Sequence, residues 1–371
     1  MSWPVRIVSV GSHTPSRRVT STDLDAAHGR APGLTFARSG VVARHWIGPG
    51  ETSVSMTVGA LGQVLDRADW EPDELDALIV ASVLPEQPMP TTAILTAAQL
   101  GVAGGRLEAF DVNASCLGFL TALQQASFGI AMGRWNRVAV AAVDIASKGL
   151  NHADLESSAL FGDGAAAVLL EGSPIASPPP VEPPPPPVEP PPLVELVETP
   201  ATGLDKLNQR RDKLNQRPSE ILALRLASYP SAAGLCRIAA GGTRWNPVTP
   251  PPSATDYLFA MDGLGMMKLV AREMPGFLDG LLAEAGVDAE AIDVVVPHQA
   301  SGLGLRFLRE RLPVRSETVV DILAEHGNQV SASMPTALAH AVDTGRLERG
   351  GLCLLIGTGA GLLFGGAVLR Y

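Results

Sequence analysis

The sequence predicts an α/β protein made of two similar halves. Short apolar runs bounded by turn residues have the length of buried strands, and longer runs rich in Ala and Leu have the length of helices. Alternation of strands and helices is typical of parallel-rich sheets with helices on their faces. The second half repeats this order, which suggests an internal duplication, although no clear sequence repeat survives.

Each half contributes its own strands and helices. In the first half strands are predicted at Val5–Val10, Ala77–Val83, Ala109–Val112, Val138–Val143 and Ala165–Leu170, and helices at Ser53–Leu65, Ala93–Leu100 and Leu117–Met132. In the second half strands are predicted at Ile221–Leu226, Ile292–Val296, Cys353–Gly357 and Leu362–Leu369, and helices at Leu264–Glu284, Gly302–Arg311 and Pro335–Thr344. The helix Leu264–Glu284 is expected to break near Pro275-Gly276, because proline removes a backbone donor.

Composition excludes several classes of protein. The 371 residues allow one large or two moderate domains, and a hydrophobic content of 46% with a mean hydropathy of +0.18 indicates a large buried core. A net charge of -10 argues against general affinity for nucleic acid. Because no run reaches about 18 apolar residues, no membrane span is expected. The opening segment, Met1 to Val8, lacks the apolar stretch of a signal peptide.

Three cysteines, Cys116, Cys236 and Cys353, are too few and too scattered for a disulfide framework or a zinc site. They predict a protein of the reducing cytoplasm. No metal is expected, since no cluster of ligand residues occurs. No redox cofactor is expected either, since no nucleotide-binding fingerprint opens a first helix.

A proline-rich segment separates the halves. We expect an N-terminal half over residues 1–173, a low-complexity insert over 174–219 and a C-terminal half over 220–371. Proline cannot donate the hydrogen bonds of a sheet and favours extended conformations. The insert is interpreted as a surface loop without a catalytic role. A docking arm for a partner that binds proline-rich sequence, or a lid over the active site, is the alternative.

Cys116 is the candidate nucleophile. It falls between the strand Ala109–Val112 and the helix Leu117–Met132, where free N–H groups and the helix dipole favour a thiolate and a developing oxyanion. A buried structural cysteine is the competing interpretation, and it is the commoner fate of a lone cysteine.

The segment DVNASCLGFLTAL around Cys116 resembles the nucleophile segment of the beta-ketoacyl-acyl-carrier-protein synthase III family, within the thiolase-like superfamily. Further matches follow in the family's order: FGDGAAAVLL from Phe161, VPHQAS from Val296, HGNQVSASMP from His326 and LIGTGAG from Leu355. The resemblance implies a thiolase-like fold. Two pseudo-duplicated βαβαβαββ halves would form a layered αβαβα core.

His298 and Asn328 are the candidate partners of Cys116. His298 follows a predicted strand, at the carboxyl end where open α/β sheets place ligands. Asn328 lies in a turn after Gly327. A loop histidine and a turn-tolerant asparagine are the competing interpretations, and His326 is expected only to shape the turn. Two neutral donors that converge on one oxygen, however, suit the enolate left when a malonyl thioester loses carbon dioxide.

The resemblance implies the same roles. Cys116 would take the acyl group, and His298 with Asn328 would hold the malonyl thioester carbonyl, with Ala300 and Ser301 of VPHQAS among the substrate contacts. A second oxyanion hole would use the backbone N–H groups of Cys116 and Ala360. The family usually has a run of glycines at Ala360, but alanine still carries the N–H.

Two groups of residues are expected to contact the carriers of the substrates, which are coenzyme A and acyl carrier protein. Arg38 resembles the arginine of the family's coenzyme A site, whereas the tryptophan that stacks on the adenine there is replaced by Leu34. The arginine that docks acyl carrier protein five residues after the histidine is replaced by Leu303. Lys268, Arg306 and Arg309 are the basic residues expected to take its place, or they form an ordinary solvated face.

Met89 matches the position at which the partner subunit lines the acyl pocket in a family homodimer. Relatives that join two chains head to head have a glutamate base there, and methionine cannot act as a base. The sequence therefore predicts a homodimer that joins an acyl-CoA to a malonyl thioester, carried by acyl carrier protein, in fatty-acid or polyketide initiation. The rivals are an acyltransferase of the same fold that acts on oxygen or nitrogen, and a non-catalytic scaffold.

Overall fold

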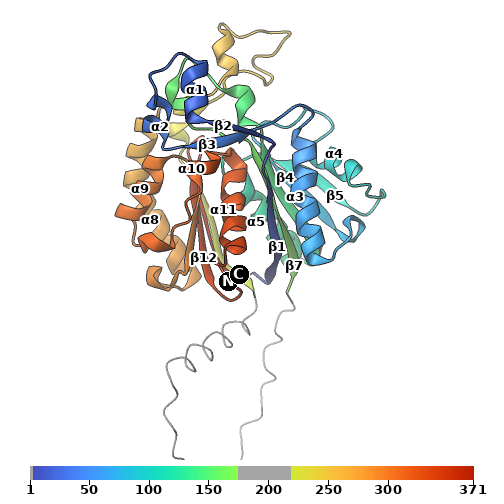
Figure 1. Ribbon diagram of the computed structural model, residues 1–371. Coiled ribbons are helices and arrows are strands. Elements are labelled where there is room, and N and C mark those ends of the chain that lie inside the picture. The colour runs from blue at the N-terminus through green and yellow to red at the C-terminus, as the bar shows by residue number, and fades with distance from the viewer. Residues whose placement is uncertain (1–2, 174–218) are drawn as a thin grey trace, which may run out of the picture.

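The computed structural model describes residues 3–173 and 219–371, and it has five layers in the order helix, sheet, helix, sheet, helix (Figure 1). Each sheet takes its strands from one side of the proline-rich insert. Apart from Ser219, the predicted insert lies outside the described residues.

The first sheet has the strand order β1-β7-β6-β4-β5. Its strands are β1 (Val5–His13), β4 (Ala77–Ala81), β5 (Glu108–Val112), β6 (Arg137–Asp144) and β7 (Gly164–Gly172). β1 and β6 both pair antiparallel with β7, whereas β4 pairs parallel with both β6 and β5. The parallel strands β4 and β6 are almost wholly apolar and buried, as strands covered on both faces must be.

The second sheet repeats this arrangement with the order β8-β13-β12-β11. Its strands are β8 (Glu220–Ser228), β11 (Val294–Pro297), β12 (Leu352–Gly359) and β13 (Leu363–Arg370). The pairings are again antiparallel, antiparallel and parallel. An isolated parallel bridge from Val295 to Val319 stands where the first sheet has β5. This repeated order confirms the predicted two-half α/β fold.

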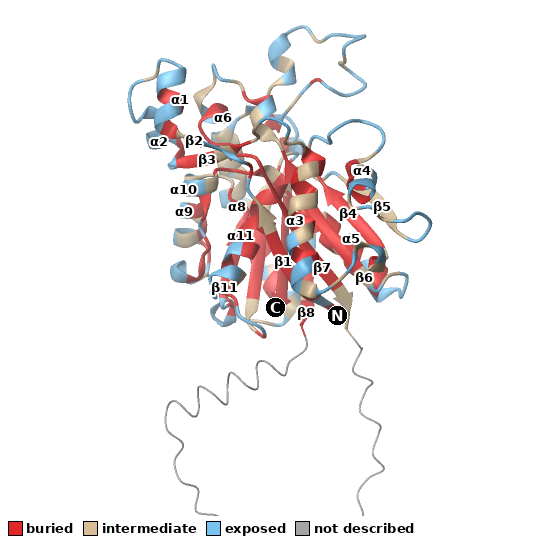
Figure 2. Ribbon diagram, turned by 45° about the vertical axis from the view of Figure 1, so that its right-hand side comes forward, coloured by how far each residue is buried: buried red, intermediate tan, exposed pale blue. Residues whose placement is uncertain are grey.

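Helices fill the space between the sheets and cover their outer faces. The middle layer contains α5 (Gly118–Ala131) and α11 (Ser333–Asp343), which share one apolar cluster with both sheets (Figure 2). The outer layers are α3 (Ser53–Ala68) and α4 (Thr92–Gln99) on the first sheet, and α8 (Gly263–Ala285) and α9 (Gly302–Arg311) on the second. No helix of the described chain is long and apolar enough to cross a membrane.

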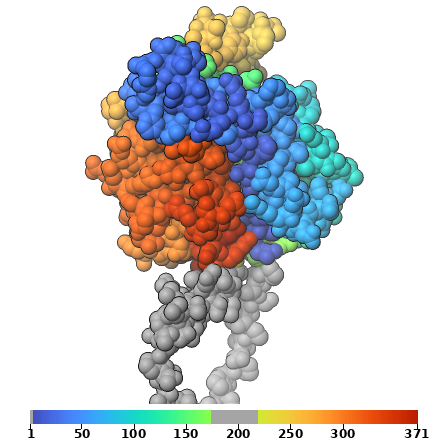
Figure 3. Space-filling model, in the orientation of Figure 1, coloured from blue at the N-terminus to red at the C-terminus, as the bar shows by residue number. Residues whose placement is uncertain are grey.

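A cap that the sequence did not predict covers the carboxyl ends of the parallel strands. It contains the ribbon of β2 (Arg17–Thr20) and β3 (Ala43–Trp46) and the short helices α1 (Ser21–Ala27), α2 (Leu34–Ser39), α6 (Leu155–Ser158) and α10 (Leu323–His326). The two-residue strands β9 (Cys236–Arg237) and β10 (Ala260–Met261) flank a long loop, which stands out at the top of the molecule (Figures 1 and 3).

The expected break near Pro275 is wrong, because α8 runs through it without interruption. Proline does remove one N–H from the helix. Burial of Met274, Phe277, Leu278 and Leu281 against the second sheet holds both flanking turns in place. Tertiary packing therefore outweighs the local cost of proline.

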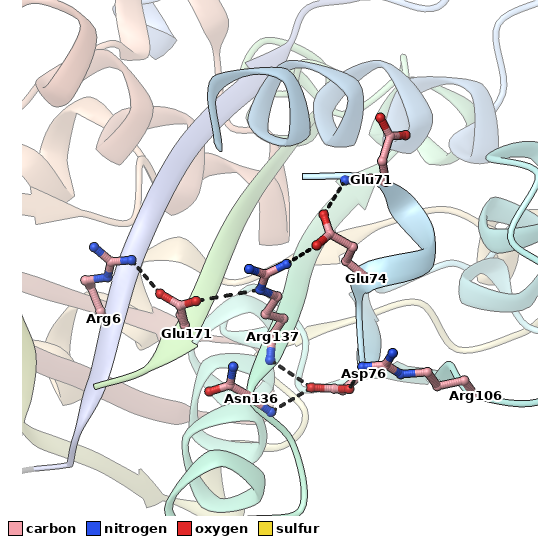
Figure 4. A network of polar contacts seen from close by, with 8 residues as sticks. All are labelled: Arg6, Glu71, Glu74, Asp76, Arg106, Asn136, Arg137 and Glu171. Atoms are coloured by element: carbon pink, nitrogen blue, oxygen red, sulfur yellow. Dashed lines mark hydrogen bonds and ion pairs between the residues drawn. The ribbon is translucent and has the colours of Figure 1, made fainter. Parts of the chain in front are cut away.

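An ion-pair network ties the strands of the first sheet together at the end opposite the cap (Figure 4). Glu171 of β7 contacts Arg6 of β1 at 2.5 Å and Arg137 of β6 at 3.6 Å. Asp76 accepts hydrogen bonds from the backbone N–H groups of Asn136 and Arg137, at 2.8 and 3.0 Å. Because these ion pairs are partly exposed, each contributes no more than about 1 kcal/mol to stability.

The two attachment points of the insert lie next to each other at that same end. The Ser173 hydroxyl donates to the carbonyl oxygen of Ser219 at 3.4 Å. In the antiparallel pairing of β6 and β7, Asp144 is opposite Gly164 and Arg137 is opposite Glu171. Because a strand rises about 3.4 Å per residue, the insert leaves the fold roughly 25 Å from the Asp144 end.

We predict that replacing Pro178–Arg217 by a short Gly/Ser linker leaves folding and turnover essentially unchanged. The adjacent ends need only a short bridge, and the attachment points lie far from the cap. Circular dichroism and steady-state kinetics of the deletion variant check this. A variant with an unchanged spectrum but no turnover would establish the insert as functional.

Candidate active site

Cys116 lies in the turn between β5 and α5, as predicted. The preceding residue, Ser115, has a φ of 53°, which is uncommon for a residue other than glycine. Its N–H donates to Asn113 Oδ1 at 3.0 Å, and Asn113 Nδ2 donates to the carbonyl oxygen of Val83 at 3.1 Å. These bonds hold a sharp turn that places the cysteine before the helix.

Burial raises the pKa of the Cys116 thiol to about 12, because the thiolate would be poorly solvated. The charge of Asp144 acts in the same direction, and so does a second thiol, Cys236. The backbone N–H groups of Ala360 and Cys116 point at the sulfur and lower its pKa, but by less. The expectation that this turn favours a thiolate in the free protein is therefore wrong, because desolvation outweighs the N–H groups.

His298 follows β11, and a hydrogen bond from its N–H to the carbonyl oxygen of Ile356 on β12 fixes its backbone at 2.9 Å. The next side chain, Gln299, donates to the carbonyl oxygens of Pro297 and Val320 at 3.0 and 3.2 Å. Gly357 allows the close approach, since a Cβ there would lie 2.6 Å from the Cβ of His298. Burial lowers the pKa of His298 to about 4, so the ring is neutral near pH 7.

The side chain of Asn328 is oriented by three hydrogen bonds. Its Oδ1 accepts from the N–H of Val330 at 2.8 Å and from the hydroxyl of Ser333 at 3.3 Å. Its Nδ2 donates to the carbonyl oxygen of Ala300 at 3.2 Å. An amide nitrogen carries two N–H groups, so one remains for a ligand. Val330 has a φ of 55°, a rare value for a β-branched residue.

These groups meet at one cavity of about 490 Å³. Cys116, His298, Asn328, Ala300 and Ala360 all line it. Its other walls are largely apolar and include Leu84, Ile145, Leu150, Phe161, Ile238, Phe259, Met261 and Met266. The cavity therefore combines a thiol, neutral hydrogen-bond donors and room for a hydrocarbon group.

Sequence analysis missed two residues of this cavity that carry titratable side chains. Asp144 stands at the end of β6, and Cys236 stands on β9, opposite Met261 of β10. Asp144 directly follows the predicted strand Val138–Val143, and the sequence analysis gave it no role. Cys236 was treated only as one of three scattered cysteines, since its short strand has no clear sequence pattern.

The predicted carrier contacts lie outside this cavity. Arg38 is exposed on α2, and Ser301 caps α9 by accepting from the N–H of Gly304 at 3.1 Å. Lys268 and Arg306 are exposed, whereas Arg309 pairs with Asp321 at 3.0 Å. Their roles stay predictions.

Met89 is 83% exposed in the loop before α4 and does not line the cavity of its own chain. Within the described residues, no group of three or more His, Cys, Asp or Glu side chains could hold a metal ion.

Known proteins identify the family. The family model of 3-oxoacyl-[acyl-carrier-protein] synthase III matches residues 110–178. The model of the C-terminal part of the same family matches residues 282–371. Beta-ketoacyl-[acyl-carrier-protein] synthase III 3 of Streptomyces coelicolor is 33% identical over 365 residues, covering 98% of this chain and 96% of that protein. The chain belongs to the 3-oxoacyl-[acyl-carrier-protein] synthase III family.

Solved structures of similar proteins share the fold. The 3-oxoacyl-[acyl-carrier-protein] synthase III of Aquifex aeolicus has a TM-score of 0.79 and 28% identity, over 99% of this chain and all of that chain. A priming β-ketosynthase from the R1128 polyketide pathway has a TM-score of 0.80 and 25% identity, over 100% of this chain and 97% of that chain. The thiolase-like fold is therefore confirmed.

We predict that Gly357→Ala displaces His298, because the added methyl group would meet its Cβ at 2.6 Å. A shift of about 1 Å can lower a rate on the order of 100-fold. The control is Gly62→Ala in α3, where an added Cβ meets no atom within 4 Å. Carbon dioxide release from a malonyl thioester should fall in the first variant alone. Equal rates in both would contradict this role of Gly357.

Proposed function

We propose that this protein joins an acyl group from a coenzyme A thioester to a malonyl thioester by decarboxylative Claisen condensation. The product is a 3-oxoacyl thioester that starts a fatty-acid or polyketide chain. The observation that carries the proposal is the meeting of Cys116, His298, Asn328 and the Ala360 N–H at one largely apolar cavity. Membership of the synthase III family supports it.

In the first half-reaction Cys116 attacks the carbonyl carbon of the acyl thioester. A carbon–sulfur bond forms to the enzyme, the bond to the departing thiol breaks, and the proton of Cys116 ends on that thiol. The N–H groups of Cys116 and Ala360 already point at the sulfur, so they lie where a carbonyl oxygen on it would develop negative charge.

In the second half-reaction a malonyl thioester loses carbon dioxide. The electrons of the broken carbon–carbon bond pass into an enolate, whose oxygen is held by His298 and the free N–H of Asn328. Because the His298 pKa is lowered to about 4, its ring is a neutral donor that keeps its own proton. The enolate carbon then attacks the acyl carbon, and the thiolate of Cys116 leaves.

We also propose the carrier of the malonyl group and the cellular compartment of the protein. Acyl carrier protein is the proposed carrier of the malonyl group, with Lys268 and Arg306 as exposed basic contacts. A thiol nucleophile needs a reducing compartment, and we propose the cytoplasm.

We predict that Cys116→Ser abolishes acylation, whereas His298→Ala and Asn328→Ala each retain it and slow decarboxylation about 100-fold or more, the usual effect of losing an oxyanion donor. Acyl-CoA labelling followed by mass spectrometry measures the first step, and carbon dioxide release measures the second. Acyl adducts on Cys236 or Cys353 would contradict the assignment of the nucleophile. Equal loss of both steps in the His298 and Asn328 variants would contradict their role as enolate donors.

A homodimer is proposed through β5. Among residues 3–173 and 219–371 this strand pairs only with β4, which leaves its other edge open to a second strand. Large apolar side chains stand exposed beside it, with Met89 at 83% and Ile94 at 45%. Pairing with β5 of a second copy would cover both features and bring Met89 toward the partner's cavity.

We predict that the double variant Met89→Asp with Ile94→Asp shifts the protein from dimer to monomer, because both charges would be buried at the interface. Light scattering behind a sizing column measures the mass. The control is Leu264→Asp on α8 of the other half, which replaces a side chain that is 67% exposed. A double variant that keeps the dimer mass would rule out this interface.

A further inference from the structure

Asp144 is a buried carboxylate between the nucleophile turn and the loop of Asn328. It ends β6, is 3% exposed and lines the active-site cavity. Its Oδ1 accepts from the N–H of Val83 at 2.8 Å and from the hydroxyl of Ser82 at 3.3 Å. Its Oδ2 accepts from the N–H and the hydroxyl of Ser331, at 2.9 and 2.5 Å. These donors are all neutral, as is the N–H of Leu84, which also bonds the carboxylate.

The hydrogen bonds of Asp144 cross from one half of the protein to the other. Val83 follows β4 in the first half, and its carbonyl oxygen holds Asn113 of the nucleophile turn. Ser331 belongs to the second half and follows Val330, whose N–H holds Asn328. Asp144 thus stands at the centre of a chain of contacts that leads to Cys116 on one side and to Asn328 on the other.

The geometry distinguishes a positioning role from direct participation in the chemistry. A carboxylate has about four acceptor positions. The N–H groups of Val83 and Ser331, the Ser331 hydroxyl and the N–H of Leu84 occupy them, whereas the Ser82 hydroxyl donates at shorter range, 2.8 Å, to the Leu84 carbonyl oxygen. Burial raises the pKa of Asp144 to about 6, and the bonds from Ser331 and Val83 oppose this shift. The carboxylate therefore has no free lone pair for a substrate proton while these contacts persist.

We propose that Asp144 is a positioning residue that sets the spacing between Cys116 and Asn328, so that each enolate meets the acyl group. This inference rests on the proposed condensation. Where the spacing is lost, decarboxylation still breaks the malonyl carbon–carbon bond and releases carbon dioxide. The enolate carbon then takes a proton from water and leaves as an acetyl thioester, while the acyl group remains on Cys116. Decarboxylation becomes uncoupled from condensation.

The test is Asp144→Asn, which keeps the shape of the side chain. One oxygen becomes an NH2 group, which cannot accept a hydrogen bond from Val83 or from Ser331. The contact between residue 144 and one of the two halves is therefore lost. Acylation of Cys116 should be largely retained. The ratio of carbon dioxide released to 3-oxoacyl thioester formed should rise about tenfold or more, since small misplacements of reacting groups have large effects on rate. Acetyl thioester should account for the difference.

A matched control is Asp163→Asn. Asp163 is also fully buried and accepts from neutral donors, namely Ser147 N–H at 2.8 Å, Ser147 hydroxyl at 2.6 Å and Ile47 N–H at 2.9 Å. It does not line the cavity. Its substitution should lower the thermal midpoint of unfolding and leave the product ratio unchanged.

The outcomes separate this inference from the proposed function. If the wild-type protein condenses and Asp144→Asn leaves the ratio of carbon dioxide to 3-oxoacyl thioester unchanged, the positioning role alone is overturned. The same conclusion follows if the rates of acylation, decarboxylation and condensation all fall by the same factor. Should Asp144→Asn fail to fold, Ser331→Ala removes the 2.5 Å hydroxyl bond to Asp144, together with a long 3.4 Å contact to the Ala81 carbonyl oxygen, and keeps the N–H bond. It should raise the ratio by a smaller factor, and an unchanged ratio would overturn the inference. A wild-type protein that forms no acyl-enzyme would overturn the proposed function, and this inference with it.

Discussion

The packing of both sheets on one shared pair of helices is the constraint on which the candidate active site depends. α5 and α11 lie between the sheets, and their buried residues belong to the same apolar cluster as strands of both halves. The approach is close on both sides of α5. A Cβ at Gly118 would lie 3.1 Å from the Cβ of Ala81 on β4, and a Cβ at Gly365 on β13 would lie 3.1 Å from Cδ1 of Leu120 on α5. Since interiors are packed like crystals, such contacts fix the relative height of the two sheets. The strand ends of both halves therefore meet at one cavity.

The duplicated fold divides the chemistry between equivalent positions. β4 and β11 occupy matching places in their sheets, and they are followed by Ser82 and His298. β6 and β12 also match, and Asp144 and Ala360 stand at their ends. In the first half the strand end supplies a carboxylate for support, whereas in the second it supplies a backbone N–H that points at the sulfur of Cys116. Two similar frameworks thus hold different groups around one site.

Most of the fold could be predicted from the sequence because its central strands are short, apolar and separated by helices. Cys116, His298 and Asn328 could also be found, since each lies in a distinctive motif beside a predicted strand or helix. The residues that hold the site in place could not be predicted. Asp144 directly follows the predicted apolar strand Val138–Val143 and lies in none of the recognised motifs, and its bond to Ser331 spans 187 positions. The positive φ of Val330 could not be foreseen either, because a β-branched residue disfavours it.

One physical cause, desolvation, sets the protonation of the site. Burial raises the pKa of Cys116 and of Asp144 and lowers that of His298, so each group is pushed toward its neutral form. Near pH 7 the thiol of Cys116 and the ring of His298 are therefore neutral, whereas Asp144, with a pKa of about 6, stays ionised. A neutral thiol and neutral donors suit a reaction whose charges are transient. The thiolate appears only as it attacks or departs, and the enolate exists only between the loss of carbon dioxide and carbon–carbon bond formation. Donors fixed before the reaction stabilise these species without reorganising. The burial that makes Cys116 a weak acid at rest therefore also strengthens the N–H groups that its reaction needs.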